Sequence, residues 1–95
     1  MKLVVWEGQD DVSLYNDYLY DDEPTLASRT RFYAWLADTE EGQWVRANFS
    51  YHSFKVVANV DHHTYQQRVS VYIETEPSAT VTEYILRFKH GIKHP

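Results

Sequence analysis

Residues 43–60, QWVRANFSYHSFKVVANV, are the part of the sequence on which the predicted architecture depends. Apolar side chains recur at every odd position from Val45 to Tyr51 and at every even position from Phe54 to Val60. Neighbouring side chains of a strand point to opposite faces, so a change of parity requires an extra residue or a bend. We therefore predict a β-bulge or sharp bend near His52 and Ser53.

The segments around this stretch also carry β-type patterns. After a turn at residues 61–64, Val69, Val71 and Ile73 alternate with polar residues, as a half-buried strand requires. Residues 3–6 form a short apolar run, which a polar turn at residues 7–10 is expected to end. Residues 81–88 are apolar on both parities and predict a last strand covered on both faces.

Two segments contain apolar spacings that are typical of a helix. Residues 25–38 fit one face of a helix and also alternate as a strand would, and we favour the strand. The reason is the short polar connection at residues 39–42, which ends in glycine and suits a hairpin. Residues 11–20 have apolar spacings of three, four and seven, with Asp10 or Asp11 as cap and Pro24 beyond the end, and predict a short helix.

Composition favours a sheet. Val, Ile, Thr, Tyr, Phe and Trp total 35 residues, whereas Leu, Met and Ala total 13. We predict one α+β, mostly β domain over residues 1–95. Its architecture would be an antiparallel four- or five-stranded meander, bent near residue 52, with one short N-terminal helix. An exposed sheet edge in so small a protein invites pairing with a second copy, so we expect a homodimer.

Several classes of function lack support in the sequence. The chain has no cysteine, which excludes disulfides, thiolate zinc sites and cysteine nucleophiles. It has neither a signal-peptide core nor an apolar run of about 18 residues, so we expect a soluble, cytoplasmic protein. Gly-rich phosphate loops, nucleophile elbows and zinc-protease motifs are also absent. We therefore expect a non-enzymatic protein without a cofactor.

Histidines are the remaining candidates for metal ligands. His62 and His63 follow Asp61 directly, and His90 and His94 stand four residues apart. A folded site that gathers two or three of them is one interpretation. Adjacent side chains of a strand point to opposite faces, so polar loop residues and a basic tail are the interpretation we prefer, and no metal is expected.

Charge is distributed unevenly along the chain. Residues 1–23 carry seven acidic groups against Lys2 alone, while the remaining chain has seven acidic and eight basic groups. Tyr15, Tyr18 and Tyr20 are interleaved with these acids. The sequence therefore predicts an acidic segment with aromatic side chains.

Such a segment suits a non-catalytic protein-binding module or inhibitor that acts as a nucleic-acid mimic. Carboxylates can take the place of phosphates on a basic, nucleic-acid-binding partner protein, and tyrosines add stiff contact area. The residues predicted to contact the partner are Asp10, Asp11, Tyr15, Asp17, Tyr18, Asp21 and Asp22. The alternative is a solvated acidic helix that keeps the domain soluble while its tyrosines pack on the sheet.

Two other functions stay open. Aromatic and basic side chains could form a sheet face on which single-stranded nucleic acid stacks. They are Arg29, Arg31, Tyr33, Trp35, Trp44 and Arg46. The net charge of −5 counts against this interpretation, because affinity for nucleic acid depends on neutralising phosphates. A small enzyme whose site is assembled from residues scattered in the sequence is the third interpretation.

Overall fold

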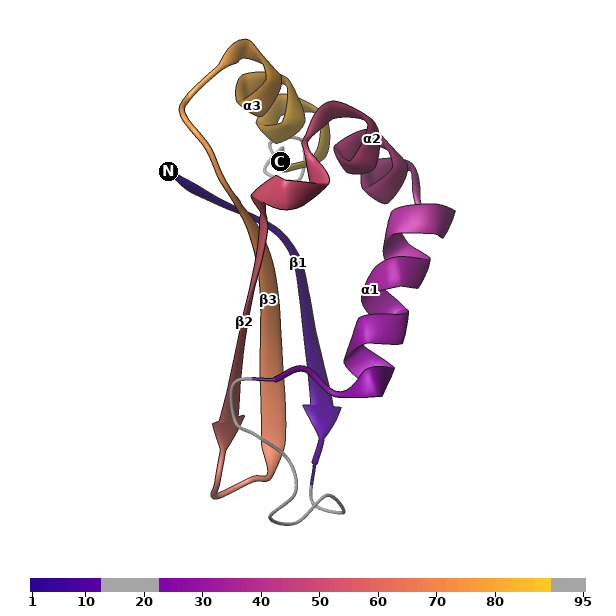
Figure 1. Cartoon of the computed structure of the whole chain (residues 1–95), viewed down its shortest axis with the longest axis vertical. Helices are drawn as coiled ribbons and strands as arrows, with labels where there is room; N and C mark the ends of the chain where they lie inside the picture. Colours follow the sequence, from indigo (N-terminus) through magenta and orange to yellow (C-terminus); the bar gives the residue numbers. More distant parts are fainter. Residues whose placement is uncertain (13–22, 90–95) are drawn as a thin grey trace, which may run out of the picture.

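The computed structural model describes residues 1–12 and 23–89. This part contains β1 (Lys2–Asp11), α1 (Leu26–Asp38), α2 (Glu40–Asn48), the 3₁₀ turn η2 (Tyr51–Ser53), β2 (Phe54–Asp61), β3 (Gln66–Glu74), α3 (Ala79–Tyr84) and the π-helical turn η3 (Ile85–Lys89). The strands form one antiparallel sheet in the order β1-β3-β2, with α1 alongside it and α2 and α3 near one end (Figure 1). The predicted four- or five-stranded meander with one helix is wrong, because the described part holds three strands and three α-helices.

Helix α1 replaces the strand predicted over residues 25–38. Thr25 is the N-cap, and its side-chain oxygen accepts a hydrogen bond from the Ser28 backbone nitrogen at 3.1 Å. Phe32 and Leu36, one turn apart, are buried, whereas Ala34 between them is exposed. The apolar alternation at residues 32, 34 and 36 is therefore incidental, and the helical spacing is the one that packs.

A second helix follows at once where a hairpin was predicted. Thr39 is the N-cap of α2, and its hydroxyl accepts from the Gly42 backbone nitrogen at 2.9 Å. A Cβ built on Gly42 would lie 2.0 Å from the Trp35 carbonyl oxygen. Gly42 thus permits the close approach of α1 and α2, and it does not adopt the left-handed conformation expected for a hairpin turn.

The change of parity near residue 52 has a different cause from the one predicted. Residues up to Asn48 belong to α2, and η2 connects this helix region to β2. The apolar pair Val45 and Phe49 is therefore spaced four apart along a helical turn rather than alternating in a strand. Of the two predicted alternatives, the β-bulge is wrong, because the register irregularity of the sheet lies in β1 between Val4 and Trp6, whereas the chain does turn at η2, between a helix and a strand.

The alternation predicted in β2 and β3 is confirmed by their pairing. Val56 lies opposite Val71 and Ala58 opposite Val69, so the even residues of β2 share the inner face with the buried residues of β3. Strand β1 extends beyond the predicted turn at residues 7–10, because it pairs with β3 as far as Asp11.

The last predicted strand, residues 81–88, is helical. Ser78 caps α3 by accepting from the Val81 backbone nitrogen at 3.2 Å. Val81 and Tyr84 are fully buried, and the Tyr84 ring lies 5.9 Å from the Trp44 ring and 5.5 Å from the Phe88 ring, centroid to centroid. Apolar residues on both parities here reflect spacings of three and four, which suit a helix better than a doubly covered strand.

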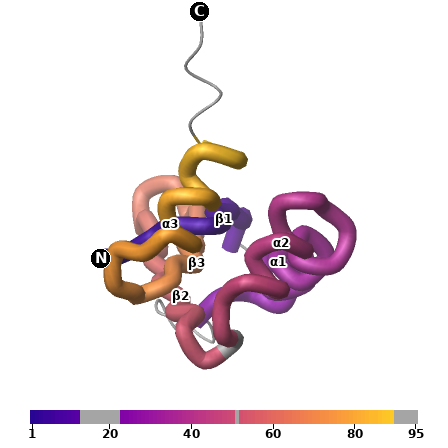
Figure 2. The backbone as a smooth tube through the Cα atoms, turned by 90° about the horizontal axis from the view of Figure 1, so that it is seen from above, coloured from indigo at the N-terminus to yellow at the C-terminus, as the bar shows by residue number. Residues whose placement is uncertain are grey.

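One core joins the sheet to all three α-helices. It consists of Leu3, Val5, Phe32, Leu36, Val45, Val71, Ile73, Val81 and Tyr84. Viewed from above, α1 and α2 lie together on one side of the strands (Figure 2). The predicted N-terminal helix falls largely on residues 13–22, outside the described residues. Across residues 1–12 and 23–89, no helix is long and apolar enough to cross a membrane.

Candidate functional site

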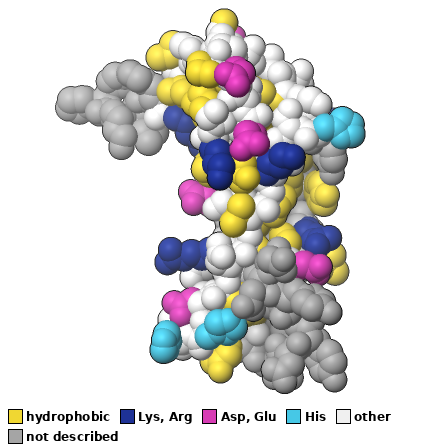
Figure 3. All heavy atoms as spheres, turned by 60° about the vertical axis from the view of Figure 1, so that its left-hand side comes forward, with side chains coloured by type: hydrophobic (Ala, Val, Ile, Leu, Met, Phe, Trp, Pro, Cys, Tyr) yellow, Lys and Arg dark blue, Asp and Glu magenta, His cyan; other side chains and the backbone are white. Residues whose placement is uncertain are grey.

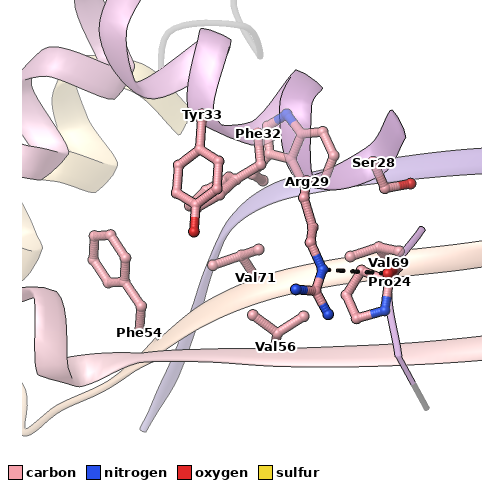
Figure 4. Close-up of a pocket in the computed structure, with 10 residues that line it drawn as sticks. Pro24, Ser28, Arg29, Phe32, Tyr33, Phe54, Val56, Val69 and Val71 are labelled. Carbon is pink, nitrogen blue, oxygen red and sulfur yellow. Dashed lines mark hydrogen bonds between the residues drawn. The ribbon is translucent and has the colours of Figure 1, made fainter. Parts of the chain in front are cut away.

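An apolar groove of about 250 Å³ lies between α1 and the inner face of the sheet. Its floor consists of Val56 on β2 with Val69 and Val71 on β3, and Phe32 and Tyr33 form the wall on α1 (Figure 4). The groove therefore depends on the helix over residues 26–38.

The groove is open along β2. Val56 is 50% exposed and Tyr33 is 53% exposed, although both line it. Phe54 lies at one end, with its ring centroid 6.3 Å from that of Phe32. Arg29 reaches from α1 towards Val56, and its Nε donates to the Pro24 carbonyl oxygen at 3.3 Å (Figure 4). A cationic side chain thus stands over an apolar floor.

A buried polar cluster fixes the start of α1 and hence the position of Arg29. The Thr25 hydroxyl donates to Asp10 Oδ2 at 2.6 Å, and the Thr25 backbone nitrogen donates to Gln67 Oε1 at 3.1 Å. Gln67 Nε2 in turn donates to the Glu23 carbonyl oxygen at 2.6 Å. Thr25 and Gln67 are almost completely buried, and such a satisfied network holds its members in one arrangement.

The chemistry of the groove favours binding over catalysis. Among its described lining residues are no His, Asp, Glu or Lys that could act as an acid or base. The Ser28 hydroxyl accepts a hydrogen bond from Arg31 Nη2 at 3.2 Å. None of the described lining residues is a base that could activate this hydroxyl. The volume lies below the usual range of about 300–1,000 Å³ for small-molecule pockets. The groove of one chain therefore suits an apolar side chain, with an anionic group near Arg29.

The structure describes two residues of the predicted acidic face. Asp10 is half-buried and holds the Thr25 hydroxyl, while Asp11 is exposed and lies opposite Gln66, which also pairs with Asp61. The other predicted residues lie outside the described part: Tyr15, Asp17, Tyr18, Asp21 and Asp22. On the face shown in Figure 3, the described acidic and basic side chains are intermingled. The acidic face stays a prediction.

The residues proposed as a stacking platform do not share a sheet face. Four of them lie on α1 and two on α2. The Trp44 ring packs against Tyr84, and Trp35 stacks on Phe32 with ring centroids 6.0 Å apart. Arg31 Nη2 is engaged by the Gln9 carbonyl oxygen at 3.0 Å. Trp35, Trp44 and Arg31 are thus engaged in packing or at the sheet edge, whereas Arg29, Tyr33 and Arg46 are exposed.

The described histidines do not line the groove. His62 and His63 are exposed in the β2–β3 turn, where Asp61 Oδ1 accepts from the His63 backbone nitrogen at 2.9 Å. His90 and His94 lie outside the described residues. In the part of the chain that the structure describes, no three His, Asp or Glu side chains form a metal-binding group.

Tyr84 belongs to the core rather than to a reactive site. Burial raises the pKa of its hydroxyl well above the ordinary range, and the hydrogen bond to Glu41 Oε2, at 2.5 Å, adds to the effect. Glu41 Oε2 also lies 3.1 Å from Lys89 Nζ. This cluster ties α2 to α3 and η3, and it does not line the groove.

The groove was not predicted from the sequence. A helical interpretation of residues 25–38 would have placed Arg29 and Tyr33, four residues apart, on one face. The floor residues Val56, Val69 and Val71 were predicted as inward-facing positions of strands, but no sequence pattern placed a helix beside them. Comparison of the chain with protein-family models, curated proteins and solved structures found no match.

Proposed function

We propose that this protein is a non-catalytic binding module whose acid-rich N-terminal segment contacts a basic partner protein. The observation that carries the proposal is the charge of residues 1–23, which hold seven acidic groups and one basic group. A partner surface adapted to nucleic acid would match them, and the module would act as an inhibitor by occupying that surface. Carboxylates would replace phosphates in the contact.

The anchoring of this segment supports the proposal. Before the acidic residues Asp17, Asp21 and Asp22, Val12 is buried and its backbone nitrogen donates to the Tyr65 carbonyl oxygen at 2.8 Å. After them, Thr25 is held by Asp10 and Gln67. Val12 and Thr25, which flank these acidic residues in the sequence, thus lie at the same end of the sheet. Attachment at both ends lowers the entropy that a partner must overcome on binding.

Described carboxylates of this segment and of β2 lie near these anchors. Asp11 and Asp61 lie on either side of Gln66 in one row of the sheet, and Glu23 is exposed beside the start of α1. Charges of like sign gathered at one end steer a basic partner during diffusional encounter. This geometry favours a docking role over a purely solubilising one.

Direct binding of nucleic acid has less support. The exposed ring of its proposed platform is Tyr33, since Trp35 and Trp44 are partly buried against other aromatic rings. The chain also carries a net charge of −5, which opposes association with phosphates. An oligonucleotide that quenches tryptophan fluorescence in a salt-sensitive manner would favour it over the protein partner.

Charge reversal tests the acidic segment. The variant Asp17→Lys, Asp21→Lys and Asp22→Lys is compared with a control in which Asp38, Glu74 and Glu76, all exposed and outside residues 1–23, are changed to Lys. Both variants have the same net charge, so only the position of the charges differs. Tagged protein is used to capture partners from nuclease-treated lysate of its native host at low and high salt.

We expect wild type and control to retain a basic protein at low salt and the segment variant to lose it. With the captured partner purified, the association rate of the segment variant is expected to fall at least about tenfold. Equal binding by the two variants would contradict the acidic docking segment. Circular dichroism of each variant checks that the domain stays folded.

We also propose a cytoplasmic location, since a cysteine-free chain suits a reducing compartment, and self-association through a sheet edge. Edge strands present unpaired backbone groups to any chain of matching shape. Co-purification of two differently tagged copies would test the association, and failure to co-purify at concentrations up to the millimolar range would contradict it.

A further inference from the structure

The two edges of the sheet are protected to different extents. The β1 edge carries a register irregularity between Val4 and Trp6, and Arg31 of α1 donates to the Gln9 carbonyl oxygen at 3.0 Å. Bulges and capped carbonyls are devices that discourage strand addition. In contrast, β2 pairs with β3 over Phe54–Asp61 without an irregularity. On its other side, β2 has no strand partner within residues 1–12 and 23–89. The β2 edge is therefore the one suited to pairing.

The sequence of β2 is complementary to itself when two copies run antiparallel. A two-fold axis through Ala58 places Lys55 opposite Asp61, Val56 opposite Val60 and Val57 opposite Asn59. Each pair has the same parity, so inner residues meet inner residues and outer residues meet outer residues. Opposite charges directly across an antiparallel pair stabilise it, and like charges destabilise it. This register contains two such charge pairs and two Val–Val pairs.

We propose that the protein forms a homodimer in which β2 of one copy pairs antiparallel with β2 of a second copy in this register. The proposal rests on the self-association proposed above and specifies its geometry. The result is a six-stranded sheet in the order β1-β3-β2-β2-β3-β1, with both inner faces on the same side. Strand addition in this manner uses main-chain hydrogen bonds for affinity and side-chain pairs for register.

The dimer also changes the groove. In one chain its β2 side is open, and Val56 is half exposed there. In the dimer, Val60 of the second copy lies beside Val56 and continues the apolar floor. The two grooves then open onto one shared face, each bordered by its own α1. The groove of a single chain is thus small and open on its β2 side because the second copy supplies the rest of the apolar floor.

The absence of cysteine makes the register directly measurable. Val57→Cys and Asn59→Cys chains, both changed at exposed positions, are oxidised mildly alone and as a mixture. Directly opposite Cβ atoms lie about 4.5–5.5 Å apart, close to what a disulfide needs, whereas diagonal residues are about 7–8 Å apart. We expect a cross-linked mixed dimer and little product from either variant alone. Arg46→Cys, exposed on α2, gives the level of random collision.

The three samples separate the alternative registers. A strand shifted by two residues in one direction would cross-link Val57→Cys with itself, and a shift in the other direction would cross-link Asn59→Cys with itself. Either result, or a mixture no more cross-linked than the Arg46→Cys control, would overturn the proposed register. Because these products differ in mass when one chain carries a tag, gel electrophoresis distinguishes them.

Sedimentation equilibrium of charge variants provides a second test. Lys55→Glu places like charges opposite Asp61 twice per dimer, so we expect the dissociation constant to rise at least about tenfold. Adding Asp61→Asn removes the repulsion while keeping an oxygen for the His63 backbone nitrogen, and should recover part of the affinity. Arg46→Glu changes the charge equally and should leave the dimer intact.

The outcomes separate the proposals. A wild type that stays monomeric at all concentrations overturns both the self-association and its geometry. A dimer that is insensitive to Lys55→Glu and gives no mixed cross-link overturns the geometry alone. Neither result bears on docking of the acidic segment, which the charge-reversal capture measures separately.

Discussion

Replacing Gly42 by alanine is the most informative test of the helical arrangement. In a helix interior, alanine is favoured over glycine by about 1 kcal/mol, so propensity alone predicts stabilisation. Here a Cβ would lie 2.0 Å from the Trp35 carbonyl oxygen and 2.7 Å from Leu36 Cα, both backbone atoms. Separating α1 from α2 would also disturb Thr39, whose hydroxyl donates to the Trp35 carbonyl oxygen at 2.7 Å and caps α2.

The expected balance is a net loss of stability. Overpacking costs about 1–3 kcal/mol, and contact with backbone rather than a flexible side chain places this case at the upper end. Weakening the Thr39 cap adds about 1 kcal/mol. After the gain in propensity, we expect a loss of about 2–3 kcal/mol, which corresponds to a fall in Tm of about 10–20 °C.

Urea unfolding followed by circular dichroism and tryptophan fluorescence measures this change. Ala47→Gly, an exposed change in the same helix, serves as control and should cost about 1 kcal/mol from propensity. A Gly42→Ala protein as stable as wild type, or more stable, would refute the close packing of α1 on α2. A loss of stability no greater than that of Ala47→Gly would show that overpacking at Gly42 costs less free energy than expected.

Three further predictions concern the polar cluster, the core and the groove. Thr25→Val removes the cap of α1 and the hydroxyl donor to Asp10, and should cost about 2–4 kcal/mol in urea unfolding; a loss below about 0.5 kcal/mol would contradict the structural role of the cluster. The pKa of Tyr84 is raised in the folded state, so the contribution of this residue to the free energy of unfolding should be constant below pH about 10 and should fall above it by up to about 1.4 kcal/mol per pH unit. Unfolding measured as a function of pH should show this slope for wild type and not for Tyr84→Phe. Arg29→Ala should weaken fluorescence-detected binding of anilinonaphthalene sulfonate about fivefold, because its sulfonate loses an exposed cation, whereas Arg46→Ala should leave binding unchanged.

Residues 54–74 show how far the sequence alone determined this fold. The alternation of Val69, Val71 and Ile73 with polar residues, and the even apolar phase of β2, predicted two strands and their inward faces. Strand patterns of this kind are local, because the period of two is imposed by the pleat and one face meets the core. The change in parity near residue 52 was also present in the sequence. It marked the junction between a helical region and a strand. The parity of apolar residues alone cannot distinguish such a junction from a bulge within one strand.

Residues 25–38 and 81–88 show what only the tertiary structure decided. Both segments have apolar residues at spacings that fit a helix and a strand, so the outcome depended on caps and partners. Thr25 and Ser78 cap helices there, and Gly42 permits the close contact between α1 and α2. The numerical excess of β-forming residues was misleading because aromatic side chains such as Trp44 and Tyr84 fill a core between helices equally well.

The candidate surfaces divide in the same way. The acid-rich segment is a property of the sequence, since charge is counted without knowledge of the fold, and it determined the kind of partner proposed. The groove and the β2 edge, which has no strand partner within residues 1–12 and 23–89, were decided by tertiary structure, because they require α1 to pack beside β1 and β3 to lie between β1 and β2. Arg29, Val56 and Val71 are far apart along the chain and meet only when helix and sheet pack. Packing is cooperative and depends on all elements at once, so local patterns could not determine it.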